Sequence, residues 1–583
     1  MSARRTGSFV WGSRVRVWVG TWVCGGMVGL ASGAGAVGVA EPSWIDAKVG
    51  EIVSVGRGVV KREELGRSLG GRPIHLLTIA RGAEGEVRPA VLIVAGIDAR
   101  HRVGVETALG VAEAWASSPP EWLVGRTVYV VPCLNPDGFV RGGPRADTPR
   151  RDEPGDADRD GRTDEDPAED LNGDGLITMM RVADPGPALR LTPTMVDDPD
   201  FPGLMRAPDA AAGERATYAV LIEGLDNDGD GSFNEDGWGG SGGGGIDLDS
   251  NFPAHWPEFS DGAGVRPLQA PETLALARWA LDRGDIAAVI VYGRHDTVTA
   301  IPKAGEMDAS RQVPLGIEQD DKALYEAASK RFKEITGIHG APRPDTNGSF
   351  VAWAYAHLGV PAFSTPVWVR PDQVAEDKRP KPAEKPGATR EEGDAAPTPR
   401  PEPKTDEAKW LRYFEGRSDL PGFVPWRAFD HPQLGPVEIG GFIPGAMMNP
   451  PPEEVSSLVD RQSAFVADLA GRLPMIEVEG VGESLAGGLW RVTMRARNAG
   501  EWPTLSAIGR KARRNAPTRI TIDAPVDRLV SGEKTRIEWS IPGGGHAEAR
   551  WTLRTEGMGK AVVRVTSPIL GTRTVEIPLE DAR

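Results

Sequence analysis

Two residues that can bind a metal or move a proton follow the most apolar predicted strand of the chain. Residues 91–95 (VLIVA) form a continuous, mostly β-branched run, which is typical of a buried parallel strand. Asp98 and His101 come directly after it. Open α/β sheets place their sites in loops at the carboxyl ends of such strands. The pair therefore indicates a metal site, a general base, or the remnant of one.

An acidic repeat between residues 141 and 245 supplies a second group of candidate ligands. Residues 156–166 (DADRDGRTDED) match residues 226–236 (DNDGDGSFNED), and residues 170–175 (DLNGDG) form a partial third copy. Oxygen ligands at alternate positions, with glycine at the sixth, let a tight loop wrap around a hard cation. One copy alone is equally compatible with a solvated acidic loop, but three copies favour calcium. The predicted ligands are Asp156, Asp158, Asp160, Asp164, Asp170, Asn172, Asp174, Asp226, Asp228, Asp230 and Asn234.

The elements that must position Asp98 and His101 alternate between strands and helices. A helix is predicted at about 103–116, with strands at 74–80 and 127–132 on either side in the sequence. Further predictions are a helix at 271–281, a strand at 286–292, a helix at 320–336 and a strand at 360–364. This order predicts an α/β domain with a mixed, mainly parallel sheet flanked by helices.

Length and composition predict several parts, because 583 residues are too many for one core. The α/β domain is predicted over residues 41–370, with the acidic segment 141–245 as a calcium-loop insertion. Residues 371–408 are rich in proline and charge, which predicts a disordered insertion. Residues 409–474 are predicted to complete the α/β domain. Short alternating strands then predict a β-sandwich over residues 475–583.

The amino-terminal residues and the charge bear on compartment and partners. A basic start and an apolar run over residues 1–40 predict a signal peptide cleaved before Glu41, with an uncleaved anchor as the alternative. Cleavage would leave Cys133 as the only cysteine, so no intrachain disulfide is expected. The net charge of −16 argues against a nucleic-acid partner. We expect export to the periplasm, cell surface or medium, without a stable membrane span after cleavage.

Several motifs, in order, resemble the zinc carboxypeptidase family of the carboxypeptidase A and T type. They are residues 66–68 (GRS) with 71–73 (GRP), 95–101 (AGIDARH), 135–138 (NPDG), 247–253 (DLDSNFP), and 348–355 with 359–361 (GSFVAWAY, GVP). The resemblance implies that family's α/β fold and a zinc ion held by two histidines and a glutamate. It also implies a glutamate as general base, an arginine that polarises the substrate carbonyl, and an Asn-Arg pair that clamps the substrate's terminal carboxylate.

The chain differs from the family at the implied metal ligands. Asp98 and His101 stand where the family has histidine and glutamate, so a carboxylate and an imidazole are present in swapped order. Gly293 stands at the third position, and His295 lies two residues beyond it. The resemblance therefore implies Asp98, His101 and His295 as a rearranged zinc site.

The implied catalytic and substrate-binding positions differ more. Asp249 and Ser250 replace the clamp pair, and Pro366 stands where the family has its catalytic glutamate. Arg181 is the candidate for the polarising arginine. Loss of the general base alone lowers the rate by roughly 10²–10⁴-fold.

Other interpretations of these residues remain open. Asp98 can instead cap the helix that follows, and His101 can be a packed imidazole. Glu106, Glu272 and Glu438 are possible replacements for the missing base.

Two functions remain open. The first is an exported zinc metallocarboxypeptidase-type hydrolase of peptide C-termini or cell-wall peptides, with altered or lost catalysis. The alternative is a calcium-stabilised pseudoenzyme that binds a peptide, a cell-envelope ligand or a partner without hydrolysis.

Overall fold

A computed structural model describes most of the chain after residue 41. The described residues are 42–82, 85–141, 148, 150–157, 159–236, 245–311, 313–340, 345–375, 401–417, 420–555 and 558–579. The predicted signal peptide, Asp158 and most of the predicted disordered insertion lie outside these residues. Among the described residues, no helix has both the length and the apolar character needed to cross a membrane.

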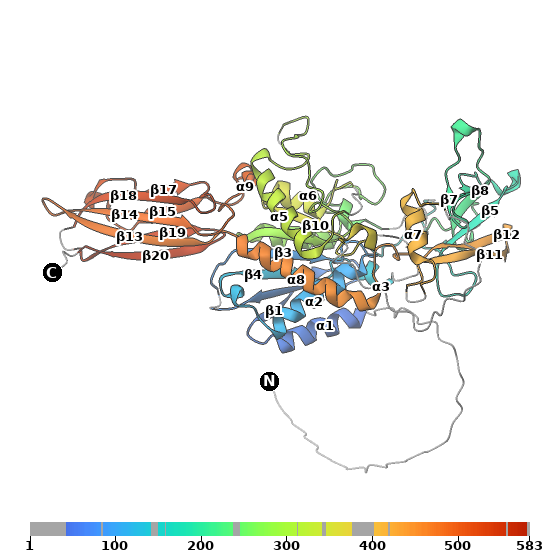
Figure 1. Cartoon of the computed structure of the whole chain (residues 1–583), viewed down its shortest axis with the longest axis horizontal. Coiled ribbons are helices and arrows are strands. Elements are labelled where there is room, and N and C mark those ends of the chain that lie inside the picture. The colour runs from blue at the N-terminus through green and yellow to red at the C-terminus, as the bar shows by residue number, and fades with distance from the viewer. Residues whose placement is uncertain are drawn as a thin grey trace, which may run out of the picture. The chain divides into compact units, whose positions relative to one another are not determined.

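A six-stranded mixed sheet forms the centre of the α/β domain (Figure 1). Its order is β1 (Val60–Arg67), β2 (Pro73–Ala80), β4 (Thr127–Val131), β3 (Ala90–Ala95), β9 (Ile286–Tyr292) and β10 (Ala362–Thr365). Strands β4, β3, β9 and β10 run parallel to one another, whereas β1 and β2 pair antiparallel. The predicted mixed, mainly parallel sheet is confirmed.

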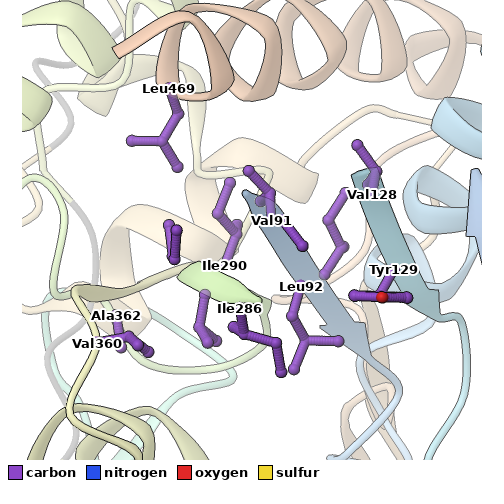
Figure 2. Close-up of a cluster of buried hydrophobic side chains, with 14 of the residues drawn as sticks. Val91, Leu92, Val128, Tyr129, Ile286, Ile290, Val360, Ala362 and Leu469 are labelled. Carbon is purple, nitrogen blue, oxygen red and sulfur yellow. The ribbon is translucent and has the colours of Figure 1, made fainter. Parts of the chain in front are cut away.

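The core explains why β3 and β9 lack polar residues. Every residue of both strands is buried, because both faces of the sheet are covered. Figure 2 shows Val91 of β3, Val128 of β4 and Ile290 of β9 among the clustered side chains, with Leu469 reaching them from a helix. That helix is α8 (Val455–Arg472), which packs on α2 (Arg102–Ser117) beside α1 (Pro42–Val55).

Further helices complete the domain, and short helical turns connect its parts. The helices are α3 (Pro136–Arg141), α4 (Pro271–Asp282), α5 (Lys322–Thr336), α6 (Phe350–Trp353) and α7 (Asp406–Phe414). The turns are η1 (Glu121–Gly125), η2 (Pro187–Leu189), η3 (Ala210–Ala212), η4 (Leu248–Ser250), η5 (Gln319–Asp321), η6 (Ala354–Leu358), η7 (Pro371–Gln373), η9 (Pro452–Glu454) and η10 (Val526–Arg528).

A second sheet joins the acidic segment to a later part of the chain. Its order is β11 (Phe423–His431), β12 (Gly435–Phe442), β5 (Met179–Ala183) and β8 (Tyr218–Ile222), with a small core of its own. Strands β6 (Val196–Asp197) and β7 (Met205–Arg206) pair nearby in sequence. Of residues 409–474, which were predicted to complete the α/β domain, α8 packs on α2, whereas β11 pairs with β12, and β12 pairs with β5 of the acidic segment.

Two four-stranded antiparallel sheets follow Met475, which confirms the predicted β-sandwich. One contains β13 (Ile476–Leu485), β14 (Leu489–Asn498), β18 (His546–Arg554) and β16 (Leu529–Ser531). The other contains β17 (Thr535–Glu538), β15 (Thr518–Ile522), β19 (Lys560–Ser567) and β20 (Gly571–Pro578), and α9 (Ala507–Ala512) lies between β14 and β15 in sequence. Buried and exposed residues alternate along β14 and β18, as expected for strands with one face on a core.

Candidate functional site

Three neighbouring parallel strands bring the predicted site loops to one edge of the sheet. The loop after β3 carries Asp98 and His101, the loop after β9 carries His295, and Pro366 follows β10. Gly96 turns the chain out of β3 with a φ of +60°, and a Cβ there would lie 2.9 Å from the Cα of Cys133. The sheet thus positions these residues as the sequence predicted.

Asp98 lies in an ion-pair network with two arginines. It is 1% exposed, and its carboxylate accepts hydrogen bonds from the backbone N–H of Arg100 (2.9 Å) and from that residue's guanidinium (3.1 and 2.9 Å). Nη1 of Arg294 lies 3.6 Å away. Burial acts to raise the pKa of Asp98, but the two guanidiniums outweigh it and hold that pKa well below its usual range. Asp98 is therefore a charge-compensated carboxylate.

The helix after Asp98 is capped by another residue. Oδ1 of Asn449 accepts a hydrogen bond from the N–H of Val103 in the first turn of α2 (2.9 Å). The carboxylate of Asp98 faces Arg100 instead. The structure thus gives the capping role that we considered for Asp98 to Asn449.

Arg294, which the sequence motifs did not indicate, connects the strand-end loops. Its Nη2 lies 2.6 Å from Oδ2 of Asp247 and 3.4 Å from Oγ of Ser250. Burial acts to lower the pKa of Arg294, but Asp247, Asp98 and Asp249 raise it above the ordinary value. The guanidinium stays charged and ties β9 to the motif at residues 247–253.

The two histidines face different partners. Nε2 of His101 lies 3.0 Å from the carbonyl oxygen of Pro366, and burial lowers the pKa of His101. His295 is fully buried, with Nε2 3.0 Å from Oδ2 of Asp249, although not at a hydrogen-bond angle. Oδ1 of Asp249 accepts the backbone N–H of Phe350 (3.0 Å).

The predicted zinc ligands do not form a metal-binding group. Across the described residues, the one set of three or more His, Cys, Asp or Glu ligand atoms within 4.8 Å of one another is Asp226, Asp228 and Asp230. Asp98, His101 and His295 thus face an arginine pair, a carbonyl and a carboxylate. A catalytic zinc needs three converging ligands and an open position, so these residues do not fit that ion.

Arg181 and Glu438, one of the possible replacement bases, form an ion pair in the second sheet, away from the strand-end loops. Arg181 lies on β5 in the second sheet, pairs with Glu438 and Asp197, and stacks 4.6 Å from the ring centroids of Tyr218 and Trp426.

The other two possible bases, Glu106 and Glu272, also have ionic or hydrogen-bond partners. Glu106 pairs with Arg102 on α2. Glu272 is fully buried and accepts the N–H of Leu69. All three possible bases have structural partners.

The acidic repeat forms three turns of the same kind: the first loop (residues 156–166), the middle loop (170–175) and the last loop (226–236). In each, the opening aspartate accepts the N–H of the glycine at the sixth position, at 3.2, 2.8 and 3.1 Å. The middle loop is held in addition by buried Glu223, which accepts the N–H groups of Leu171, Asn172 and Thr178.

Sequence reasoning missed the Glu-Asp pair that ends each full copy. Glu235 is 8% exposed, and neither of its carboxylate oxygens has a hydrogen-bond partner. Burial, and then Asp166, raise the pKa of Glu235 to about 8. The signal was present, because both copies end in Glu-Asp at their tenth and eleventh positions.

Comparison with known proteins gives two family matches. Residues 52–173 match the zinc carboxypeptidase family, and residues 476–578 match a family described as a domain of unknown function. No curated protein matches the chain.

Solved carboxypeptidase structures resemble the fold. Carboxypeptidase A from Helicoverpa armigera is 13% identical over 57% of this chain and 66% of its own, with a TM-score of 0.34. Bovine thrombin-activatable fibrinolysis inhibitor is 15% identical over 56% of this chain and 85% of its own (TM-score 0.31). The Pseudomonas aeruginosa metallo-carboxypeptidase is 15% identical over 55% of this chain and 58% of its own, with a TM-score of 0.28. The family match over residues 52–173 thus agrees with the resemblance to zinc carboxypeptidases that the motifs predict.

Proposed function

We propose that this protein is a non-hydrolytic member of the zinc carboxypeptidase family, a pseudoenzyme that binds a peptide or cell-envelope ligand. The observation that carries the proposal is the pairing of Asp98 with Arg100 and Arg294 at the strand ends. The positive guanidiniums of Arg100 and Arg294 lie beside Asp98, the first implied metal ligand, and would repel a divalent cation. An ion there would also leave both arginines without this carboxylate, which is costly for buried charges.

The catalytic positions support the same proposal. Pro366 can neither accept a proton nor bind a metal, and its carbonyl already contacts His101. Asp249 and Ser250 stand at the positions of the implied Asn-Arg clamp. The carboxylate of Asp249 would repel the terminal carboxylate of a peptide, whereas the arginine of the clamp would attract it. The site thus offers neither a base nor a clamp for hydrolysis at a peptide C-terminus.

Zinc analysis and a hydrolysis assay test this proposal. The full mature chain is incubated with zinc and an excess of calcium and is then desalted. The calcium occupies the oxygen-rich loops and so keeps zinc out of them. We expect well under one zinc per chain and no release of C-terminal residues from free or amidated peptides. One zinc per chain that disappears in His101→Ala, together with cleavage of the free peptides only, would overturn it.

Export is part of the proposal, on the strength of residues 1–40. We expect the protein from a secreting host to begin at Glu41, as read by N-terminal sequencing. A mature chain that begins at Met1 and stays with the membrane fraction would instead support the anchor.

Calcium is the cation proposed for the acidic repeat. Its loops offer carboxylate and carbonyl oxygens, which suit a hard cation better than the nitrogen and sulfur ligands of zinc. An ion that binds only the folded state raises the free energy of unfolding. This gain would matter in an exported protein without a disulfide, which lacks one common source of stability.

A further inference from the structure

A cavity of about 310 Å³ lies beside the segment that follows β10 and Pro366. Its walls are mostly apolar and include Val367 and Val369 of that segment, Ile338 after α5, and Leu458 of α8. Each of these four residues is at most 5% exposed. A cavity of this volume, with apolar walls and a few polar groups, is typical of a site for a small ligand.

One wall of the cavity is built by a strained turn. The N–H of Trp368 donates to the carbonyl of Pro366 (2.6 Å) across Val367, which is fully buried and has a φ of +66°. A γ-turn with a positive central φ is rare and strained, above all at a β-branched residue. Backbone strain of this kind is concentrated at ligand-binding and catalytic sites.

The turn fixes Trp368 on the cavity wall. The indole packs against Trp410, with ring centroids 5.5 Å apart, and its Nε1–H donates to Oε2 of Glu454 (3.2 Å). The carboxylate of Glu454 is therefore held at the cavity by a side chain that is itself held in place.

Two carboxylates with unused oxygens line this cavity. In the described part of the chain, neither Oε1 of Glu454 nor the side chain of Glu453 has a hydrogen-bond partner. Burial raises the pKa of Glu454 above its ordinary value and Glu453 adds to the rise, although the indole and two nearby arginines act in the opposite direction. One of these arginines, Arg461, also lines the cavity and donates to the carbonyl of Thr336 (3.4 Å). The carboxylates would gain from a cationic donor.

We propose that this cavity binds an organic ammonium group on an apolar stem, supplied by a free amine or by the lysine side chain of a peptide. The stem lies against the apolar walls, and the ammonium donates to Glu454 and Glu453. Because Trp368 already holds Glu454, little ordering is needed when the ligand binds. The inference goes beyond the proposed function, since the cavity contains none of the residues implied for zinc, base or clamp.

Titration calorimetry of the full mature chain tests the proposal with n-hexylamine, hexanol and hexanoate, which share an apolar stem. We expect saturable binding of hexylamine, at least tenfold tighter than that of hexanol or hexanoate. Glu454→Gln keeps an acceptor for the indole and should remove this preference. Asp460→Asn is the matched control, because it removes an exposed carboxylate of α8 that does not line the cavity, and it should keep the preference.

A second pair of variants locates the site. Ser456 and Ser457 are exposed neighbours on α8, and of the two only Ser457 lines the cavity. Ser457→Trp should obstruct the cavity and weaken hexylamine binding at least tenfold, whereas Ser456→Trp should bind like the wild type. Thermal unfolding checks that each variant is folded.

Nα-acetyl-lysine amide separates the two sources of the ammonium group. Binding as tight as that of hexylamine assigns the cavity to a peptide side chain, and weaker binding assigns it to a free amine. The inference is overturned if the wild type binds neither amine, or if it binds hexylamine no tighter than hexanol or hexanoate. Wild-type behaviour of Glu454→Gln or of folded Ser457→Trp overturns it as well. None of these results bears on hydrolysis at the strand ends, which the zinc and peptide assays test separately.

Discussion

Replacing Arg294 with methionine is expected to lower the free energy of unfolding by about 3–5 kcal/mol, the range found when one partner of a buried ion pair is removed. Arg294 is the charge that Asp98 and Asp247 share, and its side chain is 14% exposed. Methionine keeps much of the volume and removes the charge. Asp98 retains Arg100, whereas Asp247 loses its guanidinium contact. The measurement is urea unfolding followed by tryptophan fluorescence.

Two comparisons make this prediction specific. Arg67→Met removes an exposed arginine that pairs with Glu64 (2.9 Å), and should cost less than about 1 kcal/mol, as is usual for surface pairs. Arg294→Met combined with Asp247→Asn should recover part of the loss, because the unpaired carboxylate is gone. Equal effects of Arg294→Met and Arg67→Met would contradict a buried network at the strand ends.

The fold was largely predictable because its main signals are local. The β-branched runs at β3, β4 and β9 fix buried strands, since a segment covered on both faces tolerates few polar residues. Chain order then limits the topology, because parallel neighbours need helical crossovers. The positions of Asp98, His101 and His295 after these strands follow directly.

What could not be predicted depends on contacts between distant segments. Arg294 follows an ordinary buried strand, and nothing in its local sequence shows that Asp98 and Asp247 meet it. The pairing of β12 with β5 was missed for the same reason, because an alternating pattern fits any antiparallel neighbour. The burial of Glu235 depends on the contact between the first and last loops, which no local pattern shows.

The Asn-Pro-Asp-Gly motif shows how a family motif can be structural. Asp137, its third residue, has a side chain that is 1% exposed. Its carboxylate accepts hydrogen bonds from Oγ of Ser68 (2.9 Å), the N–H of Gly70 (2.7 Å) and Nη1 of Arg72 (2.9 Å). These three donors belong to the turn between β1 and β2, so one carboxylate in the first turn of α3 joins that helix to the antiparallel edge of the sheet.

Asp137→Ala is expected to destabilise the protein by about 3 kcal/mol in urea unfolding, because it leaves a buried hydroxyl and an N–H without their acceptor and Arg72 without its partner. Asp137→Asn keeps one acceptor oxygen and the shape, so its loss should be about half as large. Asp320→Ala removes an exposed carboxylate 3.4 Å from Arg510 and should change stability by less than about 0.5 kcal/mol. If Asp137→Ala were as mild as Asp320→Ala, the turn would be held by its own backbone bond from Gly71 N to Ser68 O, and the motif would need another explanation.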